Sequence, residues 1–181
     1  AYTEANFQAL DTCLNIASQF LDGSTTTEGS LAEWSWDFGD FSVLSDTSNA
    51  TNASYSYPQP GFYQVSLAVE SSLGCTDSAL QTIKVLPIPN ADFVFGDRCE
   101  GSPVFFVDSS SLDSGTLIAY NWSFGSQGSS LVQNPSFTFD SAGIYNVSLI
   151  VTSSLFCRDT FSVPMTVNSL PIVSLTADTF I

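Results

Sequence analysis

Two segments of the chain alternate strictly between apolar and polar side chains, FYQVSLAVES at 62–71 and IYNVSLIVTS at 144–153. In each, a Tyr, a Val, a Leu and a second Val occupy every other position, which makes one face apolar. A period of two predicts a β-strand with one buried face. Segments 77–87, 103–110 and 136–140 share the pattern, and clusters of Gly, Ser, Asn and Pro separate them, so we expect a chain of short strands.

The chain also repeats itself. Three residues recur 86 positions later, since Phe7, Cys13 and Trp36 return as Phe93, Cys99 and Trp122. Six more recur 82 positions later, since Gly61, Tyr63, Val65, Leu67, Val69 and Cys75 return as Gly143, Tyr145, Val147, Leu149, Val151 and Cys157. So many identities in one order indicate two copies of a single unit.

Each copy offers about seven short strands in about 84 residues, the size of one β-sandwich. We therefore predict an all-β fold of two seven-stranded sandwiches, residues 1–87 and 88–170, arranged end to end. Residues 171–181 are expected to begin a further repeat or a linker. The segment 7–21 has some helical spacing, but its counterpart in the second copy alternates, so we predict β structure there too. The prolines of 85–93 predict a stiff joint.

Two motifs carry a resemblance to a known family. WSWDFGD at 34–40, followed by PGFYQVSLAV at 60–69, resembles the PKD domain, an immunoglobulin-like β-sandwich, and YNWSFGS at 120–126 is a weaker second version. The resemblance implies binding or spacing and no catalysis. The cysteine positions are similar to those of PKD arrays in large Bacteroidota surface proteins, including gliding adhesins exported by the type IX pathway. PKD modules also accompany secreted proteases, chitinases and other polysaccharide-degrading enzymes.

Acidic residues dominate the charge. The chain has 18 Asp and Glu against 3 Lys and Arg, a formal net charge of −15. This charge repels phosphate groups and so argues against nucleic-acid partners and against anionic membrane surfaces. No run of 18 apolar residues is present, so we predict no membrane insertion. The low charged fraction of 12% is typical of extracellular β-proteins, and we expect a secreted or cell-surface bacterial protein.

The residue inventory argues against catalysis. The chain contains no His, which excludes Ser-His and Cys-His nucleophiles and His metal sites. It contains no glycine-rich phosphate loop. A glycosidase-like carboxylate pair would need a cleft, which two small sandwiches do not suggest. We predict no enzyme activity, no catalytic residue and no cofactor, with calcium as the single alternative.

Asp37 and Asp40 are the candidates for that calcium site. They flank the turn glycine Gly39 and offer oxygen ligands, but calcium needs at least four more. The second copy has Ser123 and Ser126 at their positions. The other interpretation, which we favour, is that both carboxylates accept hydrogen bonds inside the turn.

Trp34 is the candidate ligand-stacking residue, because the second copy has Tyr120 at its position. Trp34 either packs or provides a platform for a sugar ring. A binding module predicts an exposed aromatic strip that includes Trp34, Phe41 and Tyr55. A spacer predicts that these side chains are buried or scattered.

Four aromatic residues shared by the copies have structural predictions. Trp36 and Trp122 are expected in the two cores. Tyr63 and Tyr145 each follow a glycine at the start of the alternating strand, where a tyrosine corner forms in sandwiches.

The even number of matched cysteines, Cys13, Cys75, Cys99 and Cys157, predicts disulfides in an oxidising compartment. One connectivity joins Cys13 to Cys75 and Cys99 to Cys157. With immunoglobulin-like topology, however, the members of each pair lie at opposite ends of a sandwich, too far apart to bond. The other connectivity joins Cys13 to Cys157 across the junction and leaves Cys75 and Cys99 to bridge neighbouring units. Both stay open at this point.

Two functions from different classes follow. The first is a segment of a long extracellular repeat protein that acts as a stalk, filament or adhesin, with neighbouring repeats of the same chain as partners. The second is an accessory module of a secreted hydrolase that binds a carbohydrate or a protein, so that surface glycans or proteins are its partners.

Overall fold

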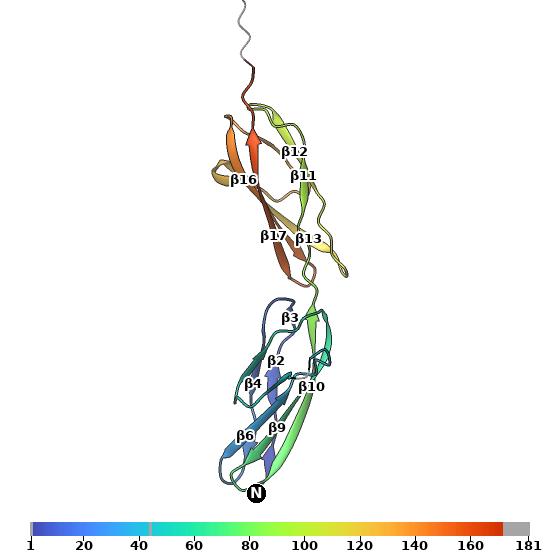
Figure 1. The fold of residues 1–181 in the computed structure, drawn as a ribbon, viewed down its shortest axis with the longest axis vertical. Helices are drawn as coiled ribbons and strands as arrows, with labels where there is room; N and C mark the ends of the chain where they lie inside the picture. Colours follow the sequence, from blue (N-terminus) through green and yellow to red (C-terminus); the bar gives the residue numbers. More distant parts are fainter. Residues whose placement is uncertain (1, 44, 172–181) are drawn as a thin grey trace, which may run out of the picture. The chain divides into compact units, whose positions relative to one another are not determined.

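The computed structural model describes residues 2–43 and 45–171, and these form two compact units that meet in the chain between Ile88 and Pro89 (Figure 1). We call them the first and the second repeat. The regular secondary structure of the described residues is all β apart from one short 3-10 turn, Gly125–Gln127, so the all-β prediction is confirmed. The prediction that a further repeat begins at 171–181 falls almost wholly on residues outside the described part of the chain.

In the first repeat a larger sheet has the strand order β3-β10-β9-β6-β7 and a smaller one the order β2-β4-β8, while β1 pairs with β5. The strands are β1 (Thr3–Glu4), β2 (Phe7–Ala9), β3 (Thr12–Cys13), β4 (Ser18–Asp22), β5 (Thr25–Thr26), β6 (Leu31–Asp37), β7 (Thr47–Ser48), β8 (Ala53–Tyr55), β9 (Gly61–Ser71) and β10 (Thr76–Leu86). The segment 7–21 is β structure, as predicted. The described part of this repeat has ten strands where seven were expected, because four of them are only two residues long.

The second repeat has sheets of order β14-β13-β16-β17 and β11-β12-β15. Its strands are β11 (Phe93–Phe95), β12 (Pro103–Asp108), β13 (Leu117–Ser123), β14 (Ser129–Ser130), β15 (Ser136–Thr138), β16 (Gly143–Ser153) and β17 (Arg158–Val167). Each repeat is therefore built around a long antiparallel hairpin, β9 with β10 and β16 with β17, and the alternation had predicted β9, β10 and β16.

Both cores are built on the apolar faces of these hairpins. Val65, Leu67 and Val69 of β9 are buried, and the residues between them are more exposed. Trp36 from β6 is fully buried and meets Phe7 edge-on, with ring centroids 5.2 Å apart. The second repeat uses the same arrangement, with Trp122 and Phe93 at 4.9 Å. Because the two indoles lie between the sheets, they hold the two layers of each sandwich together.

Tyrosine corners fix the start of each alternating strand. The Tyr63 hydroxyl donates to the Gln59 carbonyl oxygen at 2.9 Å, and the Tyr145 hydroxyl donates to the Ser141 carbonyl oxygen at 2.9 Å. A search of the described residues found no helix long and apolar enough to cross a membrane.

Candidate functional site: the motif strand and its groove

The motif at 34–40 is the end of β6 and the turn that follows it. Asp37 closes the turn, since its Oδ1 accepts a hydrogen bond from the Gly39 amide at 2.9 Å. Gly39 has a φ of +67°, and a Cβ added there would overlap the carbonyl oxygen of Gln64 on β9. The turn therefore requires glycine for both its backbone conformation and its close approach to the neighbouring strand.

Asp40 is buried, and both of its oxygens accept hydrogen bonds. Oδ1 accepts from the Ser42 amide at 3.0 Å and from the Ser42 hydroxyl at 2.6 Å, and Oδ2 accepts from the Tyr55 hydroxyl at 2.9 Å. The bond from the Ser42 hydroxyl is the main reason why the pKa of Asp40 lies below its usual 3.8, although burial acts in the opposite direction. Its own amide donates to Asp46 Oδ2 at 2.6 Å.

These bonds bear directly on the calcium candidates. The oxygens of Asp40 point to donors inside the turn, and Asp37 holds the Gly39 amide. Within the described ranges, no three acidic or cysteine side chains are grouped so that they could hold a metal ion. The geometry of Asp37 and Asp40 is that of hydrogen-bond acceptors that shape a turn.

Tyr55 belongs to the same network and to the core. Its ring stacks on Phe38 with centroids 4.7 Å apart. Burial, followed by its bond to Asp40, raises the pKa of Tyr55 to about 12. Phe41, by contrast, is fully exposed. The strip predicted for a binding module is thus not continuous, because Tyr55 packs inward beside Phe38 whereas Phe41 stands in solvent.

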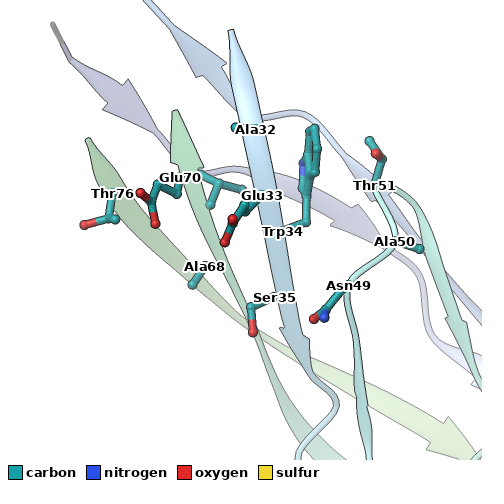
Figure 2. A pocket seen from close by; sticks show the side chains of 11 residues that line it. Ala32, Glu33, Trp34, Ser35, Asn49, Ala50, Thr51, Ala68, Glu70 and Thr76 are labelled. Atoms are coloured by element: carbon teal, nitrogen blue, oxygen red, sulfur yellow. The ribbon is translucent and has the colours of Figure 1, made fainter. Parts of the chain in front are cut away.

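The side chain of Trp34 is neither fully buried nor fully exposed. It is half-buried, packs against the core and donates from its indole Nε1 to Asp22 Oδ2 at 2.9 Å. It also lines a groove of about 730 Å³ on the first repeat, shown in Figure 2. The rest of the lining is mainly polar or small and includes Glu33, Ser35, Asn49, Thr51, Glu70 and Thr76. One fixed aromatic ring among hydroxyl, amide and carboxylate groups suits a polar ligand.

Two carboxylates stand directly opposite each other in this groove. Glu33 of β6 pairs with Glu70 of β9 across the strands, and Figure 2 shows both side chains on the groove. Like charges directly opposite each other in a sheet destabilise it. In the second repeat the corresponding pair is Ala119 and Thr152, which carry no charge. The like-charged pair is therefore a feature of the first repeat only.

A family model for the PKD domain matches residues 5–85 and again 87–167. The chain belongs to the PKD domain family. The two PKD matches agree with the two repeats, and PKD domains are non-catalytic modules.

Known relatives contain PKD domains as parts of larger proteins. The chain is 34% identical over 87 residues to the pre-pro-metalloprotease PrtV of Vibrio cholerae, which covers 48% of this chain but only 9% of that protein. The solved PKD1 domain of Vibrio anguillarum Epp is 30% identical, with a TM-score of 0.43, over 46% of this chain and 96% of its own. The PKD1 domain of the Vibrio cholerae metalloprotease PrtV is 31% identical, with a TM-score of 0.41, over 45% and 98%.

Sequence reasoning singled out Trp34 in this PKD pair but missed Glu33, Glu70 and Asn49. Comparison of the two copies gives part of the signal, because Glu33 aligns with Ala119. The two glutamates face each other because of the register of β6 against β9. A bulge between Leu31 and Glu33 shifts this register. The pattern of the sequence does not show this bulge.

Among the cysteines of the PKD pair, Cys13 and Cys157 are disulfide-bonded. Cys13 ends β3 and Cys157 directly precedes β17. The prediction that this chain forms a disulfide is confirmed, and the bond is consistent with an extracellular location.

Proposed function

We propose that this PKD pair is a non-catalytic accessory segment of a larger extracellular protein and that the groove beside Trp34 binds a carbohydrate. The observation that carries the proposal is the groove itself, with an indole held by Asp22 next to polar side chains. The family membership supports an accessory role, since a relative with a similar PKD segment is a metalloprotease precursor. The activity of the larger protein that contains this PKD pair belongs to the proposal as well.

The chemistry of the groove narrows the ligand. Trp34 offers an apolar edge to a sugar ring, while Ser35, Asn49 and Thr51 offer hydrogen bonds to its hydroxyl groups. Glu33 and Glu70 accept hydrogen bonds from hydroxyl or amine groups and repel anions. We therefore expect a neutral or amine-bearing glycan and no binding of acidic polysaccharides, which the net charge of −15 also disfavours.

The second repeat supports a single site per pair. It places Tyr120, Ala119 and Thr152 where the first repeat has Trp34, Glu33 and Glu70. These residues keep the strand pairing and omit the carboxylates. In the proposal, the first repeat binds the ligand and the second serves as a spacer.

A stalk or adhesin segment is the second candidate. The tandem repetition and the acidic surface favour it, because like-charged repeats repel one another along an extended chain. The context in a Bacteroidota adhesin, with export by the type IX pathway and a part in gliding, stays a prediction from the cysteine pattern. This candidate needs no ligand in the groove, so a binding experiment separates the two.

The experiment is a titration of the full chain with neutral hexaoses (cello-, xylo- and chito-hexaose) and with hexagalacturonate as the anionic control. We expect saturable binding of a neutral hexaose and none of hexagalacturonate. Trp34→Ala should weaken binding about tenfold, or about 1.4 kcal/mol. Tyr120→Ala, at the equivalent position of the second repeat, should leave it unchanged.

Glu33→Ala is a second variant, chosen because it changes the groove and should leave the fold intact. Glu33 is exposed, and the second repeat carries Ala119 at its position, so the fold accepts alanine there. Loss of affinity in Glu33→Ala supports the groove. Absence of binding to every hexaose, or binding that both Trp34→Ala and Glu33→Ala retain, would favour the stalk.

A further inference from the structure

The larger sheet of the second repeat has an incomplete edge at β13. β16 pairs with one side of β13, whereas β14 on the other side meets only Trp122 and Ser123. Within the described part of the chain, residues 117–121 have no strand partner on that side. A strand edge without a partner presents amide and carbonyl groups that can pair with another chain. We call residues 117–121 the open edge.

Backbone polar groups point out of the open edge. Beyond β13, the Phe124 amide donates to the Gly128 carbonyl oxygen at 2.9 Å, and within it Trp122 pairs with Ser130 of β14. The backbone groups of an antiparallel strand turn to the same side at every second residue, so those of Tyr120 face the open side as well. The open edge therefore has a donor and an acceptor to offer a second strand.

Apolar side chains stand beside the open edge. Ile118 lies at a bulge of β13 and is 53% exposed. Leu131 and Val132 directly follow β14 and are 76% and 62% exposed. A partner that covered these three side chains would remove apolar surface from water, which is favourable.

The surroundings of the open edge carry no charge. The sequence has no acidic or basic residue between Asp113 and Asp140, whereas the aligned segment of the first repeat, 28–57, has five acidic residues and no basic one. Glu33 is the middle residue of the first repeat's edge, where the open edge has Ala119. A charged residue on an edge opposes pairing with another strand. The first repeat is thus protected at this place and the second is not.

The segment after β14 is also held less firmly than its counterpart in the first repeat. There, Trp36 Nε1 donates to the Ala50 carbonyl oxygen at 2.7 Å. Trp122 Nε1 is buried and has no acceptor among the described residues, although Val132 aligns with Ala50. The segment that carries Leu131 and Val132 can therefore adjust when another chain covers it, because no bond to the indole fixes it.

We propose that the open edge binds the open edge of a second copy of this chain, antiparallel and about a two-fold axis. Such a contact uses the same surface on both copies, so Ala119 meets Ala119 of the second copy at the axis. The charges favour this occupant, because two chains with a net charge of −15 repel each other least where their surfaces are uncharged. The same contact between two first repeats would place Glu33 against Glu33, which is unfavourable.

The contact belongs to the second repeat by itself and does not depend on the glycan groove. It is also small, since five edge residues and the side chains of Leu131 and Val132 are fewer than the about 20–30 residues that each partner contributes to a standard interface. We therefore expect a weak and reversible dimer in which two chains lie side by side through their second repeats.

Sedimentation velocity of the full chain tests the proposal. The chain is first treated with N-ethylmaleimide, so that cysteine cross-links between copies do not contribute. Between about 10 μM and about 1 mM, the range for a small interface, the average mass should rise toward that of a dimer and fall again on dilution. The dimer should strengthen between about 0.02 M and about 0.5 M salt, because salt screens the repulsion between the two acidic chains. A chain that stays monomeric under all these conditions would overturn the proposal.

Ala119→Glu is the decisive variant. It copies Glu33, which the same fold accepts in the first repeat, and it should weaken the dimer about tenfold or more, because two carboxylates then meet at the axis. Thr160→Glu is the matched control. It adds the same charge to an exposed position of the same sheet, on β17 at the opposite edge, and should leave the dimer nearly unchanged.

A charge exchange tests the two-fold arrangement itself. Ala119→Glu and Ala119→Lys should each be monomeric alone, and an equimolar mixture of the two should form a dimer that weakens as salt is added. Restored association in the mixture supports the axis at Ala119. A mixture that stays monomeric, or a dimer that Ala119→Glu leaves intact, would overturn the proposal.

Discussion

At the scale of single residues, the two PKD repeats act as controls for each other. Gly39 and Gly125 occupy equivalent turns, with φ of +67° and +68°. A Cβ at Gly39 would overlap the Gln64 carbonyl oxygen, whereas a Cβ at Gly125 would lie 3.7 Å from the Asn146 carbonyl oxygen, an ordinary contact. Alanine at either position therefore strains the backbone, because both glycines have a positive φ. Only alanine at Gly39 also creates a steric overlap.

Gly39→Ala should therefore destabilise its repeat by about 2–4 kcal/mol, and Gly125→Ala should destabilise its repeat by about 1 kcal/mol. Urea unfolding followed by tryptophan fluorescence measures both, because Trp34 and Trp36 report the first repeat and Trp122 the second. Equal costs would show that β9 moves away and that the close approach is not a constraint.

Asp40 predicts a specific dependence on pH. Its pKa is lowered in the folded chain, mainly by the Ser42 hydroxyl, so its contribution to stability is present above the ordinary value of 3.8 and is lost as the pH falls through the lower, folded value. Asp40→Asn should cost about 1–3 kcal/mol at about pH 5. The difference from the wild type should shrink below about pH 3, because protonation then removes the same charge.

Urea unfolding at the two pH values checks this dependence. Asp97→Asn is the control, since Asp97 is exposed in the second repeat and should show no such difference. A cost of Asp40→Asn that stays constant between the two pH values would mean that the charge of Asp40 plays no part in holding the turn.

At the scale of elements, the pairing of β6 with β9 has a measurable electrostatic cost. Glu33 and Glu70 face each other, so Glu70→Thr, which copies Thr152, should stabilise the first repeat by about 0.3–1 kcal/mol. The gain should shrink in about 1 M salt, which screens exposed charges. Thr152→Val is the matched control, because it exchanges one uncharged side chain for another opposite Ala119 and should show no salt-dependent change.

Chemical denaturation at low and high ionic strength measures both variants. If Glu70→Thr leaves the stability unchanged at low salt, the two carboxylates do not repel each other in the free chain. If it also weakens hexaose binding, the like-charged pair is kept at a cost to stability because the ligand needs it.

Alternation and repetition predicted the long elements well. β9, β10 and β16 were expected within a residue or two, and Trp36 and Trp122 are core residues as predicted. These elements are long enough for a period of two to be recognised, and their apolar faces leave one way to pack. Two-residue strands such as β1 and β5 carry no such pattern, and local pairing alone creates them.

The candidate site was predicted less completely, for a physical reason. Trp34 stood out because the second copy has Tyr120 at its position, but its partner Asp22 and its neighbour Glu70 depend on strand register. The binding-module alternative placed Tyr55 in an exposed strip, whereas Tyr55 bonds Asp40 and stacks on Phe38, contacts between segments separated in the sequence. Residue type can be recognised locally, whereas the distance between side chains on different strands cannot.

At the scale of the whole molecule, the two PKD repeats differ in the side chains around one shared scaffold, and we propose different tasks for them. The first carries a groove with an aromatic ring and two carboxylates, and the second keeps the same scaffold without those charges. Neither task requires a catalytic group, and the sequence contains no His to provide one.

NMR can test whether the first repeat alone carries a glycan site. The isotope-labelled full chain is titrated with the hexaose that binds most tightly, and amide shifts are followed residue by residue. We expect saturable shifts at residues 32–35, 49–51 and 68–70, with none at 119–121 or 150–152 of the second repeat. Shifts that are absent, or equally large in both repeats, would contradict this expectation.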